Sequence, residues 1–114
     1  MEDRAKRLAA MMQAPVNYDH PVVKEARRHV KTAIAYKNAG HPNTDFLCFW
    51  ILVKVIGDVR SVAPLDVNRK TATSGGLMLV RNILRDLERL DIYEWYIEVA
   101  PIYIEASKAR RALS

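Results

Sequence analysis

The sequence of 114 residues contains one cysteine, Cys48, which excludes an intrachain disulfide framework and fits a reducing compartment. It also lacks a GxGxxG or GxxxxGK[ST] phosphate-binding motif and a GxSxG nucleophile elbow. Its three histidines share no metal-binding spacing with one another or with Cys48. These absences remove the common signatures of catalysis. We therefore expect a non-enzymatic protein without a cofactor or a bound metal.

Long hydrophobic runs are missing as well. The most apolar stretch, Phe46 to Ile56, is interrupted by Lys54 and is shorter than the ~20 apolar residues that cross a bilayer. The N-terminal segment is charged and has no signal-peptide core. The sequence predicts a cytoplasmic protein without a membrane partner.

The chain is rich in apolar residues and carries a net positive charge. Apolar residues make up 50% of the chain, which predicts a single folded domain over residues 1–114, with N-terminal helices in 1–42 and a second part in 43–114. Eighteen Lys and Arg against 13 Asp and Glu give a net charge of +5, which favours an anionic partner such as DNA or RNA. Residues 1–40 hold 8 basic and 4 acidic residues, so the positive excess is concentrated there.

Helical signals are clearest near the N-terminus. Asp3 to Gln13 predicts a short peripheral helix that ends before Pro15. Asp19 can cap a second helix, which we expect to end near Gly40. Three- and four-residue spacing predicts one buried face on this second helix, formed by Val23, Ala26, Val30, Ala33 and Ile34.

A second face of that helix is positively charged. Its cations occupy positions i, i+3, i+4 and i+7 and so form one line, here called the basic stripe: Lys24, Arg27, Arg28 and Lys31. Such a line can bind the phosphate backbone of a nucleic acid. It can equally be an ordinary solvated helix face, because basic stripes are common on soluble helices.

Further helices are expected along the middle of the chain. Asn43 or Thr44 can cap a central core helix that begins DFLCFWILVKVIGDV, and a short helix is possible around Asp66 to Thr71. Gly76 to Leu90 predicts a strong amphipathic helix. Its expected buried residues are Val80, Ile83, Leu84, Leu87 and Leu90, and its expected outward residues are Arg81, Asn82, Arg85, Asp86, Glu88 and Arg89.

The C-terminal segment permits two interpretations. Asp91 with Glu94 resembles a capping box, but Pro101 would break a helix midway. Alternatively, Tyr93 to Val99 alternates in polarity, which is typical of a strand, and Ile102 to Glu105 can form a returning strand. The aromatic and β-branched content favours a small β-hairpin followed by a short basic helix, Ser107 to Leu113.

The order of these elements resembles a winged helix-turn-helix domain over roughly residues 45–114. An apolar helix is followed by a short polar one, then by SGGLMLVRNILRDLERLDI and then by the hairpin. In the resemblance, LVRNILRDLERLDIY matches the recognition helix and its exit into the first wing strand. The predicted fold class is thus mainly α, with helical N-terminal residues, a winged-helix-like part and a small C-terminal β-hairpin.

The resemblance also implies binding residues. Thr73 and Ser74 would lie at a helix N-terminus, where free backbone N–H groups meet a phosphate; an ordinary flexible cap is the alternative. Arg81, Asn82 and Arg85 would contact base edges or backbone in a major groove. For the two arginines, pairing with acidic neighbours on the helix surface is the alternative.

Three functional hypotheses follow. The first is a winged-helix DNA-binding or regulatory protein, with a possible homodimer through its N-terminal helices. The second is a small basic subunit of a nucleoprotein complex, such as a guide-RNA effector small subunit or a viral nucleocapsid component, that uses the basic stripe on phosphates. The third is a protein-binding adaptor, because the expected hairpin carries Glu94, Glu98 and Glu105 together with aromatic residues.

Overall fold

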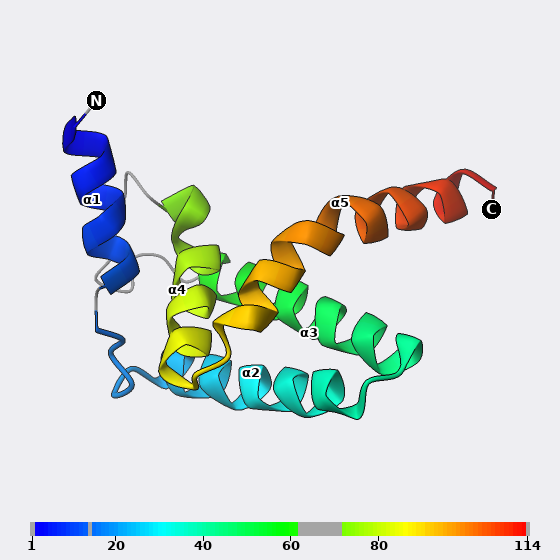
Figure 1. The fold of residues 1–114 in the computed structure, drawn as a ribbon, viewed down its shortest axis with the longest axis horizontal. Coiled ribbons are helices and arrows are strands. Elements are labelled where there is room, and N and C mark those ends of the chain that lie inside the picture. Colours follow the sequence, from blue (N-terminus) through cyan, green and yellow to red (C-terminus); the bar gives the residue numbers. More distant parts are fainter. Residues whose placement is uncertain (1, 14, 62–71, 114) are drawn as a thin grey trace.

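The computed structural model describes residues 2–13, 15–61 and 72–113, and Figure 1 shows their arrangement. The described residues form five helices: α1 (Glu2–Gln13), α2 (Pro21–Ala39), α3 (Pro42–Ser61), α4 (Ala72–Asp86) and α5 (Leu90–Leu113). The possible short helix at 66–71 lies outside the described residues. The mainly α prediction is confirmed.

Helix α2 has the bounds that the sequence predicts, although its cap differs. The residue before the helix is His20, whose Nδ1 accepts a hydrogen bond from the backbone N–H of Val22 at 3.1 Å. The helix ends at Gly40, which has a φ of 73° and donates its N–H to the carbonyl of Lys37 at 3.2 Å. Glycine adopts this left-handed conformation without a steric penalty, so it stops the helix cleanly.

Helix α3 is the central core element, as expected from its apolar sequence. It begins at Pro42, because the side chain of Thr44 bonds back to both backbone groups of His41: it accepts from the N–H at 3.0 Å and donates to the carbonyl at 2.9 Å. The bond from the His41 N–H is one half of a capping box, with threonine in the position that glutamate usually occupies. Helices α2 and α4 both pack against α3.

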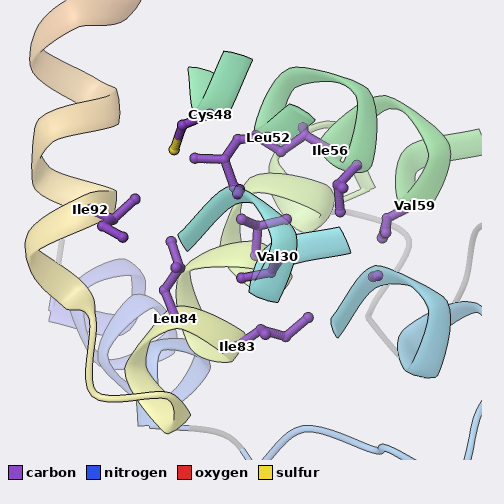
Figure 2. Packing of buried hydrophobic residues seen from close by; sticks show 12 residues of the cluster. Val30, Cys48, Leu52, Ile56, Val59, Ile83, Leu84 and Ile92 are labelled. Atoms are coloured by element: carbon purple, nitrogen blue, oxygen red, sulfur yellow. The ribbon is translucent and has the colours of Figure 1, made fainter. Parts of the chain in front are cut away.

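The hydrophobic core lies between α2, α3 and α4, and the first turn of α5 closes one end of it with Ile92 (Figure 2). Side chains from all four helices point into this space in Figure 2. Burial of aliphatic side chains is the main stabilising contribution to such a core. Its buried members are Ala26, Val30, Ala33, Cys48, Leu52, Val55, Ile56, Val59, Val80, Ile83, Leu84 and Ile92.

Helix α4 begins and ends four residues earlier than predicted. Its C-terminus is a Schellman motif, in which the N–H of Glu88 bonds to the carbonyl of Arg85 and the N–H of Arg89 bonds to the carbonyl of Leu84. Glu88 occupies the left-handed position with a φ of 59°. No glycine follows α4 in the sequence, so the usual sequence signal for the end of a helix is missing there.

The predicted β-hairpin is wrong, because residues 90–113 form the continuous helix α5 and no strand occurs among the described residues. The side chains of Ile92, Tyr96 and Tyr103 recur at helical spacing, and both tyrosine rings contact Phe49 of α3. Packing against α3 therefore prevails over strand propensity, which depends strongly on context. The predicted winged-helix part is wrong as well, because a winged helix contains a β-sheet.

Pro101 lies inside α5 and does not end it. A proline in a helix removes the hydrogen bond to the carbonyl four residues earlier, here that of Ile97. Both Pro101 and Ile97 lie on the exposed side of α5, so water can satisfy that carbonyl. Figure 1 shows the second half of α5 extending away from the other helices.

Candidate nucleic-acid interface

The basic stripe lies on the outer surface of α2. Lys24 and Lys31 are exposed, and seven helical positions separate them by about 10 Å along the axis. Within the described ranges, neither ammonium group has an ion-pair partner. These two side chains are therefore available to an anion.

Arg28 is engaged by a neighbour on the same helix. Its guanidinium forms an ion pair with the carboxylate of Glu25, and its Nε donates to Oε2 of that residue at 3.2 Å. This contact lowers the pKa of Glu25 and raises that of Arg28. Because both side chains are exposed, the pair contributes little to stability and can open when a phosphate competes.

Arg27 connects the stripe to the end of α4. Its guanidinium carbon lies 5.2 Å from the centre of the Tyr18 ring, a cation–π geometry. The Tyr18 hydroxyl donates to Oδ2 of Asp86 at 2.5 Å. Burial, followed by the hydrogen bond to this carboxylate, raises the pKa of Tyr18 to about 12. Arg27 is thus half-buried and oriented by an aromatic ring.

The other flank of α2 borders a groove that is lined mainly by apolar side chains. This groove of about 410 Å³ lies between α2 and α3, and Glu25 and Asp58 contribute carboxylates to its walls. The Nε2 atom of His29 lies 3.1 Å from a carboxylate oxygen of Glu25 in the same groove. The remaining lining is Pro21, Val22, Ala26, Val55 and Val59.

Two of the residues predicted to contact a major groove hold α1 in place. Nη1 of Arg81 donates to the carbonyl of Met12 at 3.1 Å, and Nη1 of Arg85 donates to the same carbonyl at 2.7 Å. This carbonyl belongs to the last turn of α1, where helical partners are lacking and the dipole is negative. Arg81 also stacks over Tyr93 at 5.7 Å, and Arg85 pairs with Asp86 at 2.9 Å.

Asn82 does not face outward as predicted. The residue is 5% exposed, and its Oδ1 accepts a hydrogen bond from Arg81 at 3.0 Å. Helix α1 packs against α4, and the Arg81 group that donates to Asn82 also donates to the Met12 carbonyl of α1. Because Asn82 is buried and bonded to Arg81, its amide does not face a base edge in this structure, and contact with bases stays a prediction.

Thr73 and Ser74 lie in the first turn of α4, which begins at Ala72. Their side chains lie outside what the structure describes. Their predicted position at the start of a helix is therefore confirmed. Their contact with a phosphate stays a prediction.

The nine predicted binding residues form two groups. One is the basic stripe on α2, and the other is the set on α4, in which Arg81 and Arg85 contact α1. The Tyr18–Asp86 hydrogen bond links the two groups, because Arg27 covers the Tyr18 ring and Arg85 pairs with Asp86. Sequence reasoning missed the roles of Tyr18 and of the Met12 carbonyl. Every residue has a backbone carbonyl, so the sequence does not show which carbonyl accepts a hydrogen bond from an arginine.

The described residues contain neither a metal-ligand cluster nor a membrane-spanning helix. Among the described residues, no group of three or more His, Cys, Asp and Glu could hold a metal ion. Within those residues, no helix combines the length and hydropathy needed to cross a membrane. Comparison of the chain with known protein families, curated proteins and solved structures finds no match.

Proposed function

We propose that the protein is a non-enzymatic nucleic-acid-binding protein that contacts the phosphate backbone through the basic stripe on α2. The observation that supports this most is the pair of exposed ammonium groups of Lys24 and Lys31, which have no ion-pair partner among the described residues. Arg28 lies between them and is held only by an exposed pair with Glu25. Three cations on one line can follow successive phosphates of a strand.

Contacts of this kind position a nucleic acid without reading its sequence. Binding therefore depends on charge and on salt, and it is similar for different sequences of one nucleic acid. The same contact would serve a free DNA- or RNA-binding protein and a small basic subunit of a nucleoprotein complex.

The test is the double substitution Lys24→Gln and Lys31→Gln, with Lys54→Gln as the matched control. Lys54 is an exposed lysine on α3, outside the stripe. Affinity for duplex DNA, single-stranded DNA and RNA is measured by fluorescence anisotropy at one low salt concentration. The proposal predicts a loss of about tenfold or more for the double variant and little change for the control.

The double variant removes two charges and the control removes one. A loss of binding free energy for Lys54→Gln that is half that of the double variant would therefore show that general charge, and not the stripe, carries the affinity. Comparison of the three nucleic acids then identifies the preferred class. Equal weakening for all sequences of that class supports backbone contact.

A further inference from the structure

The carboxylate of Glu25 is shared by two neighbours on α2. Its Oε1 atom accepts from the guanidinium group of Arg28, and Nε2 of His29 lies 3.1 Å from the same oxygen. Arg28 belongs to the basic stripe, whereas His29 lines the groove between α2 and α3. Glu25 thus lies between a cation of the stripe and a side chain that becomes a cation when it takes up a proton.

The charged groups around His29 come from two helices. Glu25 faces it from α2, and Asp58 of α3 lines the same groove. Lys54, one turn before Asp58 on α3, is not among the residues described as lining the groove, and neither is any residue of α4, which also packs against α2. The side chain of His29 is 35% exposed, so protons from the solvent can reach it.

Of the three side chains that meet at Glu25, histidine is the type that changes its charge between pH 5 and 8. The contact with Arg28 lowers the pKa of Glu25, so this carboxylate stays ionised throughout that interval. While His29 is neutral, Arg28 is the only full positive charge beside Oε1. A proton on His29 places a second one there, and the attraction that holds Arg28 to the carboxylate is weakened by competition.

We propose that protonation of His29 releases Arg28 from Glu25 and thereby strengthens the binding of phosphates to the basic stripe in mildly acidic solution. This inference rests on the proposed function and adds regulation by pH to the same site. Protonation also raises the local net charge from +2 to +3, counted over Lys24, Glu25, Arg28, His29 and Lys31. Both effects favour a polyanion.

The test compares the affinity at pH 6 with that at pH 8, at one ionic strength. The probes are a thymidine-only DNA strand and a uridine-only RNA strand, whose bases take up no proton in this interval. Fluorescence anisotropy should show the unmodified chain binding about threefold or more tightly at pH 6. His29→Gln should lose most of this pH ratio, because glutamine keeps a polar side chain that cannot become charged.

The other two histidines provide the controls. His41→Gln removes an exposed imidazole before α3, and His20→Asn keeps a side-chain acceptor at the N-cap of α2. Both variants should keep the pH ratio of the unmodified chain. Circular dichroism at both pH values checks that every variant retains its helical content.

A further pair of variants tests the release of Arg28 itself. Arg28→Gln should bind more weakly and lose most of the pH ratio, whereas Lys31→Gln should bind more weakly and keep it. An undiminished pH ratio in His29→Gln or in Arg28→Gln would overturn the inference and leave the proposed function intact. Absence of binding by the unmodified chain at both pH values would overturn both.

Discussion

The guanidinium group of Arg85 donates a hydrogen bond to the backbone carbonyl of Met12, with 2.7 Å between Nη1 and the oxygen. Arg81 donates to the same oxygen, so two positive charges cap the negative end of the α1 dipole. This relationship explains how a helix of 12 residues stays attached to the bundle. Isolated helices shorter than ~12–15 residues are marginal in water.

Replacing both arginines with methionine should therefore release α1. The double variant Arg81→Met and Arg85→Met keeps an apolar stem and loses both donors, and hydrogen bonds from charged groups contribute about 1–3 kcal/mol each. Hydrogen exchange should accelerate by tenfold or more in the amides of α1, at ~1.4 kcal/mol for each factor of ten, while the core amides of α3 stay protected. Arg28→Met is the control. Unchanged exchange in α1 would show that the arginines do not hold it.

Gly76 permits the close approach of α4 to α3. A Cβ at this position would lie 2.7 Å from the backbone carbonyl oxygen of Ile56 and 2.7 Å from Cγ of Arg60. Gly76→Ala should therefore lower the free energy of unfolding by about 1–3 kcal/mol, because the backbone of α3 has to shift. Gly57→Ala, where a Cβ meets nothing within 4 Å, should raise it by about 0.5–1 kcal/mol through helix propensity. Urea unfolding measures both, and a gain at Gly76 would contradict this packing.

Glu88 offers a stabilising substitution. A side chain in the left-handed region costs roughly 1–2 kcal/mol, and the carboxylate of Glu88 also lies at the negative end of the α4 dipole. Glu88→Gly should raise the free energy of unfolding by about 1 kcal/mol. Glu88→Ala keeps a Cβ and should bring only a small gain. Equal effects of glycine and alanine in thermal unfolding would rule out backbone strain as the cause.

Tyr18 should make stability fall at alkaline pH. Its folded-state pKa of about 12 lies above the ordinary value of 10.0, so the folded protein holds the phenolic proton more tightly than the unfolded chain does. The resulting stabilisation is complete below pH 10 and is lost as the pH rises from 10 towards 12. Tyr18→Phe should flatten this part of the pH profile in urea unfolding. Tyr36→Phe, at an exposed tyrosine of α2, should leave it unchanged.

Much of the helical core could be predicted from local pattern. Val23, Ala26 and Val30 share one face of α2 by simple periodicity, and the structure buries all three. The same reasoning placed Val80, Ile83 and Leu84 correctly in the core. Cys48, inside the apolar run of α3, is also buried, and burial raises the pKa of its thiol to about 11.

The wrong predictions concern residues whose environment is set by segments distant in the sequence. The alternation from Tyr93 to Val99 fits a strand by itself, but Phe49, more than forty positions away, attracts Tyr96 and Tyr103 from one face of a helix. Asn82 is polar and was expected outside, yet tertiary packing buries it and Arg81 donates a hydrogen bond to its side chain. For the candidate site, the line of the basic stripe was visible in the sequence, whereas the Tyr18 and Glu25 contacts that restrain Arg27 and Arg28 were not.

The most direct test of phosphate-backbone binding is the dependence of affinity on salt. The unmodified protein is titrated with DNA and RNA over a series of salt concentrations, and the logarithm of the association constant is plotted against that of the salt concentration. The proposal predicts a linear fall with a slope of about −2 to −4, and a slope smaller by roughly two units in the Lys24→Gln and Lys31→Gln double variant. An absence of binding at low salt, or a slope that the double variant leaves unchanged, would contradict it.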